Sequence, residues 1–108
     1  MANARIVNTP SQAIPQNSTT HAQNTISSTA EAVVDFTLNA STTHVLVQFN
    51  GAAARVTLDG TTNPTTTKGF LYNDGATAYW PRQTAIAAKA IRAAGTDVVA
   101  EIQELNYL

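Results

Sequence analysis

Hydrophobic and polar residues alternate one by one along three runs in the first half of the chain. The runs cover residues 33–38, 44–49 and 54–59, and short polar segments separate them. A period of two is typical of β-strands with one buried face, and Asn50-Gly51 is a strong signal for a tight turn. The pattern therefore predicts consecutive strands of an antiparallel sheet.

Further short strands are predicted on either side of these runs. They cover residues 69–73 and 77–80, a stretch near residues 24–28, and the closing run 97–105, where Val99 and Leu105 blur the alternation. That blurring indicates either a strand covered on both faces or a bulge. Seven or eight short strands separated by Gly and Asn turns are typical of a sandwich or small barrel. We predict an all-β fold, an antiparallel β-sandwich of jelly-roll type with at most one short helix.

The segment 81–95 is ambiguous between helix and strand. Pro81 at its start and Gly95 at its end are typical of helix boundaries. Ile86 and Ile91 are five residues apart, about 140° around a helix, so they do not form one apolar stripe. We favour a helical turn over 82–87 followed by a strand over 88–93; the alternative is a single helix of about a dozen residues.

The chain divides by composition into an arm, residues 1–29, and a β-sandwich domain, residues 30–108. The arm is polar, rich in Thr, Ser, Asn and Gln, and has little to bury. Either contact with a neighbouring subunit orders this arm, or the arm is a flexible tail; the sequence leaves both interpretations open. The arm lacks the apolar segment of a signal peptide. No apolar run in the chain approaches the 18 residues of a membrane span. We therefore expect the protein to be used or assembled in a cytoplasm.

Composition argues against several classes of function. Charged residues make up 12% of the chain and the net charge is −1, so there is no basic field for nucleic acid or an anionic membrane. The chain has no cysteine, which excludes disulfides, thiolate metal sites and a cysteine nucleophile.

The motifs of enzymes and metal sites are missing or broken. Asp59, Thr61 and Asn63 have the spacing that opens an EF-hand loop, but Pro64 and Phe70 stand where Gly and Glu are required. There is no phosphate-binding glycine motif and no nucleophile elbow, and a zinc site would have only His21 and His44. His44 opens a predicted strand, and we expect it at the surface or at a sheet edge. The sequence predicts neither an enzyme nor a metal or cofactor site.

Two stretches are candidates for interaction. The first is aromatic, at Tyr79-Trp80 with Tyr72 nearby, and could close the core, form a protein interface or carry a ligand. The second is the segment "RVTLDGTTNPTTTKGF", residues 55–70, which we interpret as a turn whose threonines could also contact a neighbour. The candidate interface residues are Tyr72, Tyr79, Trp80, Thr65, Thr66 and Thr67.

The blocks "HVLVQFNGAAARVTLDGTTNPTTTKGFLYNDG" and "YWPRQTAIAAKAIRAAGTDVVAEIQELNYL" together resemble small virion structural proteins of tailed bacteriophages. The resemblance covers residues 44–108 and leaves the arm out. It implies a non-catalytic β-sandwich subunit that decorates or cements a capsid and is assembled in the host cytoplasm. The implied partners are the major capsid protein and further copies of the chain, with a trimer favoured.

Two other functions stay open. One is a carbohydrate-binding β-sandwich module that uses Tyr72, Tyr79 and Trp80. The other is a minor tail or head–tail connector protein, which copy number per particle would separate from a shell coat.

Overall fold

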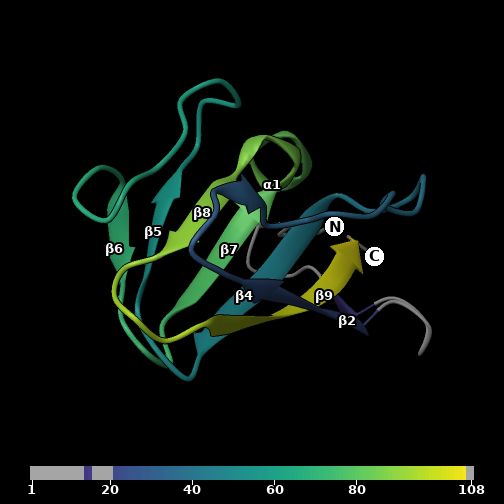
Figure 1. The fold of residues 1–108 in the computed structure, drawn as a ribbon. Helices are drawn as coiled ribbons and strands as arrows, with labels where there is room; N and C mark the ends of the chain where they lie inside the picture. The colour runs from purple at the N-terminus through teal and green to yellow at the C-terminus, as the bar shows by residue number, and fades with distance from the viewer. Residues whose placement is uncertain (1–13, 16–20, 107–108) are drawn as a thin grey trace, which may run out of the picture.

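The strands form two antiparallel sheets that pack face to face (Figure 1). The computed structural model describes residues 14–15 and 21–106. In the first sheet, sheet A, β9 and β4 are central, β7 lies on one edge, and β1 and β2 lie along successive parts of the other edge. The strands of sheet A are β1 (Ile14–Pro15), β2 (His21–Ile26), β4 (His44–Asn50), β7 (Thr77–Pro81) and β9 (Val98–Asn106).

The second sheet, sheet B, has shorter strands in the order β3-β8-β5-β6. Its two edge strands are therefore β3 and β6, and β6 pairs with β5 alone. Its members are β3 (Glu31–Ala32), β5 (Ala54–Thr57), β6 (Phe70–Tyr72) and β8 (Lys89–Arg92).

The strand pairs are nested, which fixes the topology. From β2 onward the first strand pairs with the last, β2 with β9; then β3 pairs with β8, β4 with β7, and β5 with β6. Successive pairs alternate between sheet A and sheet B. Eight strands arranged in this way form a jelly roll. The predicted all-β sandwich of jelly-roll type is confirmed.

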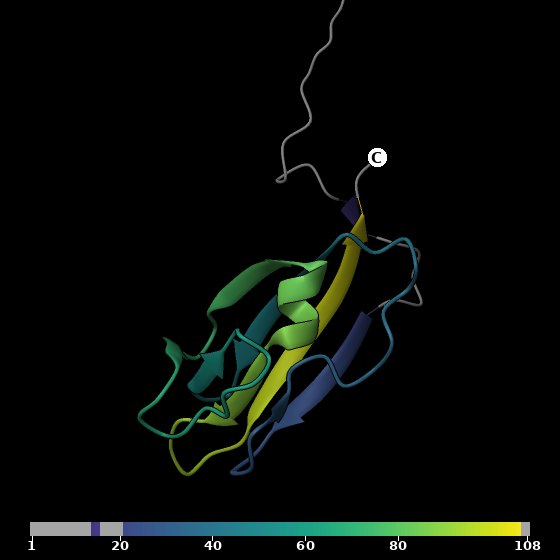
Figure 2. The ribbon, with the colours of Figure 1, turned by 90° about the horizontal axis from the view of Figure 1, so that it is seen from above.

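Segment 82–93 forms a short helix and then a strand, as favoured from the sequence. Helix α1 (Arg82–Ala87) follows Pro81 directly, and the chain becomes extended again at Ala88 before β8. Ala85 faces the core, whereas Ile86 is exposed. Figures 1 and 2 show α1 at one end of the sandwich, where it contacts β7 and β4. No helix among the described residues is long and apolar enough to span a membrane.

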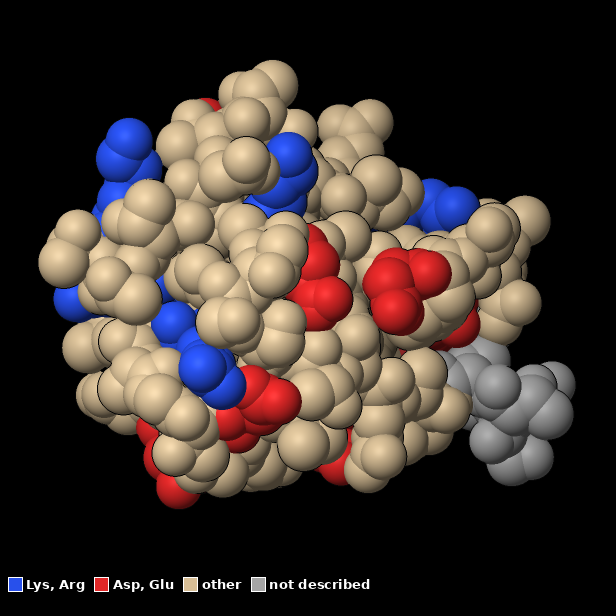
Figure 3. Space-filling view, viewed as in Figure 1, with Lys and Arg blue, Asp and Glu red and all other residues tan. Residues whose placement is uncertain are grey.

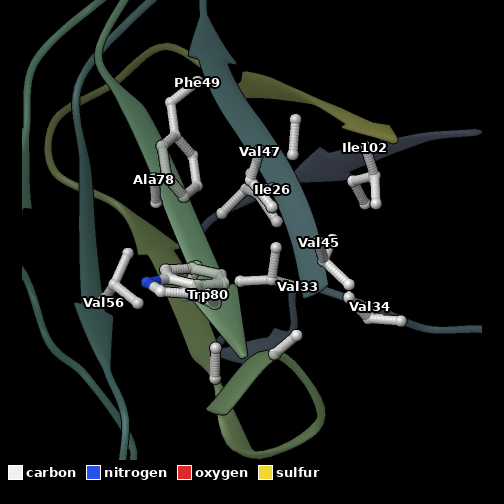
Figure 4. Packing of buried hydrophobic residues seen from close by; sticks show 14 of the residues in the cluster. Ile26, Val33, Val34, Val45, Val47, Phe49, Val56, Ala78, Trp80 and Ile102 are labelled. Carbon is white, nitrogen blue, oxygen red and sulfur yellow. The ribbon is translucent and has the colours of Figure 1, made fainter. Parts of the chain in front are cut away.

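The core lies between the sheets and is built from the inward residues of each alternating strand. Phe49 is fully buried and its ring meets those of Tyr72 and Trp80, at centroid distances of 5.0 and 6.3 Å. Aliphatic side chains fill the rest of the layer, and Figure 4 shows several of them around Trp80. The labelled aliphatic members include Ile26, Val33, Val45, Val47, Val56 and Ile102.

The strand predicted over residues 33–38 is wrong. Sheet pairing ends at Ala32, and Val33 and Val34 are both buried, which breaks the period of two. The side-chain amide of the buried Asn24 donates to the carbonyl oxygens of Ala32 and Val33, at 3.0 Å each. The Val33 N–H still donates to the Ala88 carbonyl oxygen at 3.0 Å, and beyond Val33 the chain continues as a loop that buries Leu38.

Part of the segment assigned to the N-terminal arm belongs to the sandwich. The strand expected near residues 24–28 is β2, which pairs with β9 from His21 to Ile26, and Ile26 is fully buried in the core. Residues 21–29 are thus not an arm. Residues 1–13 and 16–20 lie outside the described part of the chain, so the rest of that assignment stays a prediction.

Candidate interaction surfaces

The threonine-rich segment is a loop, residues 58–69, whose first half is held by its own side chains. The Asp59 carboxylate accepts hydrogen bonds from the Thr62 hydroxyl at 2.6 Å and from the backbone N–H groups of Thr61 and Thr62 at 3.1 and 2.8 Å. These bonds, led by that of the hydroxyl, lower the pKa of Asp59 to about 2. The Thr57 hydroxyl donates to the Thr62 carbonyl oxygen at 2.6 Å and ties the loop to β5.

Asp59, which opens the calcium-like spacing, therefore stabilises a turn. Its carboxylate oxygens are the acceptors of a turn. Among the described residues, no group of three or more His, Asp or Glu side chains is placed to hold a metal ion.

The second half of the loop is a tight turn at the loop tip. Thr65 and Lys68 exchange two backbone hydrogen bonds, at 3.0 and 3.3 Å. The Thr65 hydroxyl also accepts from the N–H groups of Thr67 and Lys68, at 3.3 and 2.9 Å. Thr65, Thr66 and Thr67 are all exposed. The three predicted threonines thus form a preformed tip that presents hydroxyl and methyl groups to the surroundings.

The strand that follows this loop exposes large apolar side chains. Phe70 is 64% exposed and Leu71 48% exposed, on an edge strand of sheet B. A groove of about 600 Å³ lies beneath the loop, and Phe70 forms one wall of it. We call Thr65–Thr67, Phe70 and Leu71 the β6 surface. Phe70 and Leu71 are neighbours on the strand and point to opposite faces of sheet B, so this surface wraps around the free edge of the sheet. The groove is lined mainly by Val56, Leu58, Asp59, Thr62, Gly69 and Phe70.

The three candidate aromatic residues do not form one strip. Trp80 is only 5% exposed, and its ring packs edge-on against Tyr72, which is itself partly buried against the core. Tyr79 points the opposite way because neighbours on a strand alternate between faces, and it is 38% exposed. Its ring stacks on His44 at a centroid distance of 5.0 Å and an angle of 5°. Trp80 therefore closes the core and offers no ring surface to a partner.

The stacking also corrects the expectation for His44. A surface or strand-edge position was expected, but His44 is only 9% exposed at the start of the central strand β4. Its outward ring is covered by Tyr79.

A second surface, which the sequence did not indicate, lies on the outer face of sheet A. Side chains from β2, β4, β7 and β9 surround a shallow hollow of about 220 Å³. These positions are as many as 82 residues apart, so no local motif marks them. We call this the sheet A hollow; its lining residues are His21, Leu46, Gln48, Thr77, Glu101 and Gln103.

Hydrogen bonds order one side of this hollow. His21 Nε2 lies 2.7 Å from Glu101 Oε1, and His21 Nδ1 lies 3.2 Å from Gln103 Oε1. Gln23 donates to the other Glu101 oxygen at 2.5 Å. The hydrogen bond to Glu101 is the main cause that raises the pKa of His21, and the bond to Gln103 is the second. The hydrogen bond from His21 in turn lowers the pKa of Glu101.

The two sheets differ in charge. The strands of sheet A contain no Lys or Arg, whereas sheet B and its loop carry Arg55, Lys68, Lys89 and Arg92. Acidic side chains lie among these basic ones, and Arg92 pairs with Asp97 at 2.6 Å. Burial raises the pKa of Glu31, and the nearby carboxylates of Asp35 and Asp97 raise it further. Figure 3 shows basic and acidic side chains interspersed over the visible face. That face has no extended field of one sign.

Comparison with known proteins finds no matching family model, no matching curated protein and no matching solved structure.

Proposed function

We propose that this chain is a non-catalytic virion subunit of a tailed bacteriophage, a decoration or cement protein that binds the capsid shell through the β6 surface. The observation that carries the proposal is the exposure of Phe70 and Leu71 on an edge strand beside an apolar groove. Scattered apolar side chains are ordinary on a protein surface, but an exposed edge strand with adjacent apolar residues is a site where other chains bind.

The β6 surface has the composition of a protein interface. Covering Phe70 and Leu71 from their present exposure would contribute roughly 2–3 kcal/mol of hydrophobic free energy. The neighbouring loop tip adds Thr65–Thr67, whose hydroxyls can bond to a partner's backbone at a lower desolvation cost than charged side chains. The Asp59 and Thr65 turns hold that tip in place, so less ordering entropy is lost on binding.

The fold and the sequence resemblance give this surface its proposed partner. Jelly rolls occur in viral capsid domains and also in lectins, so the fold alone does not choose between them. The resemblance of residues 44–108 to tailed-phage virion proteins favours the shell. A homo-oligomer, with a trimer favoured, would place several β6 surfaces on one lattice, where linked contacts gain about 10²–10⁴ in avidity.

The test is to purify particles made by the genome that carries this gene and to locate the protein in them. Mass spectrometry should detect the chain at a copy number comparable to that of the shell protein. Electron microscopy should place it on the outer capsid surface with the β6 surface toward the shell. A copy number of about a dozen or fewer would favour the connector alternative, and absence from the particle would refute the virion assignment.

A further inference from the structure

The sheet A hollow is built from two adjacent rows of outward side chains that cross four strands. In the first row, from β7 to β2, the paired residues are Tyr79, Leu46, Gln103 and His21. In the second row they are Thr77, Gln48, Glu101 and Gln23. Directly opposed residues have their Cβ atoms about 5 Å apart, so each row is a continuous line of contacting side chains.

The polar members of the rows suit a ligand with several hydroxyl groups. Amide, carboxylate and imidazole groups are planar and can meet neighbouring hydroxyls with donors and acceptors together. Gln48 uses one N–H on the Gly75 carbonyl and its oxygen on Asn50, and its second N–H makes no hydrogen bond to any described residue. The Thr77 hydroxyl makes no hydrogen bond within the described part of the chain, although it lines the hollow.

The same face favours an uncharged ligand. It contains no Lys or Arg to pair with an anion, and its one outward carboxylate, Glu101, is already bonded to His21 and Gln23. The exposed surface that lines the hollow is mainly apolar and includes Leu46, which is 39% exposed. Tyr79, 38% exposed, pairs with Leu46 and extends this apolar surface beside the hollow. A ring with polar edges and apolar C–H faces matches this combination.

We propose that the sheet A hollow is a binding site for a single neutral sugar ring, with the ring's C–H face on Leu46, beside Tyr79, and its hydroxyls on Gln48, Thr77 and Glu101. The volume of about 220 Å³ lies below the roughly 300–1,000 Å³ of sites for drug-sized ligands, in keeping with one ring. This site lies on the opposite sheet from the β6 surface. A subunit bound to a shell through β6 could therefore leave the hollow available, and the sugar site does not depend on the shell assignment.

Chemical-shift mapping of the ¹⁵N-labelled protein tests the proposal. The probes are methyl α-D-glucopyranoside, methyl β-D-galactopyranoside, methyl α-D-mannopyranoside and N-acetyl-D-glucosamine, with sodium D-glucuronate as the charged comparison. At least one neutral probe should give saturable shifts at the amides of Leu46, Gln48 and Glu101, with a Kd of about 10 mM or tighter. Residues 58–72 should not shift, and glucuronate should bind more weakly than the neutral probe.

Two substitutions separate the hollow from the rest of the surface. Leu46→Arg should fill it and weaken binding at least tenfold, whereas Leu71→Arg, the same change on the other sheet at similar exposure, should leave binding unchanged. Thr77→Val keeps the side-chain shape, removes the hydroxyl and should weaken binding several-fold.

Three results would overturn the proposal. The first is no saturable shift with any neutral probe, and the second is binding that survives Leu46→Arg. The third is a shift of the same amides with protein concentration alone, which would assign the face to a second copy.

Discussion

Gly69 lies directly against the backbone of Val56, at the point where the threonine-rich loop re-enters sheet B. A β-carbon at position 69 would come within 3.0 Å of both the nitrogen and the oxygen of Val56, and Gly69 has a φ of +122°. Neither feature is compatible with an ordinary L-residue. This contact brings the loop tip and Phe70 to the free edge of the sheet, so Gly69 positions the β6 surface.

We therefore expect Gly69→Ala to be strongly destabilising. The conformational strain of a positive φ costs about 1–2 kcal/mol, and the steric collision adds roughly 1–3 kcal/mol. Gly75→Ala is the matched control, because Gly75 has a φ of +85° but no atom within 4 Å of an added β-carbon. Urea unfolding should show the strain cost alone for Gly75→Ala and a clearly larger loss for Gly69→Ala. Equal losses would contradict the close contact.

Asn24 is predicted to hold the loop that replaces the expected strand at 33–38. Asn24→Ala removes both hydrogen bonds to the carbonyls of Ala32 and Val33, the second of which is buried, and should cost about 1–3 kcal/mol of unfolding free energy. Thr25→Ala, at the next and exposed position of β2, should change stability by no more than about 0.5 kcal/mol. Chemical denaturation of the two variants measures the difference. A neutral Asn24→Ala would show that the loop is held by burial of its apolar side chains alone.

The His21–Glu101 contact should be visible in side-chain titrations. NMR should give His21 a pKa above the usual value of about 6.5, and Glu101→Gln should return it toward that value. The raised pKa of His21 adds stability that is complete below about pH 6.5 and is lost as the pH rises through the folded-state pKa. The lowered pKa of Glu101 adds stability that is complete above about pH 4.3 and is lost as the pH falls through its folded-state pKa.

The stability difference between the wild type and Glu101→Gln should therefore be largest between about pH 4.3 and 6.5. Thermal unfolding across this range measures it, with Gln103→Glu as a second variant that should raise the pKa of His21 further. An unshifted His21, or a difference independent of pH, would exclude the contact in solution.

Alternation along the chain predicted the strands whose inner faces are mainly apolar. It placed β4, β7 and β9, and the five-residue spacing of Ile86 and Ile91 correctly divided 82–93 into a helical turn and a strand. It failed at 33–38 because Val34, Phe36 and Leu38 alternate without a partner strand, and the decisive groups are the buried Asn24 amide and the carbonyls it bonds. It assigned β2 to the arm because His21, Gln23 and Thr25 are polar and a buried Asn24 conceals the inner face.

The candidate surfaces were predicted in part. The exposed threonine tip follows from its turn residues, but the exposure of Phe70 depends on which strand ends at the sheet edge, and only the topology decides that. Trp80 is buried because it lies on the inward face of β7, and its neighbour Tyr79 lies on the outward face. The sheet A hollow could not be foreseen, since strand pairing brings together residues from both ends of the chain.

The most direct measurement of the central claim is the binding of purified protein to particles from which it has been removed. Wild-type protein should rebind them, and Leu71→Arg should reduce binding at least tenfold, because it places a charge where the β6 surface is expected to be desolvated. Leu46→Arg, the same change on the outer face of sheet A, should rebind like the wild type. Undiminished rebinding by Leu71→Arg, or a loss with Leu46→Arg in its place, would contradict attachment to the shell through the β6 surface.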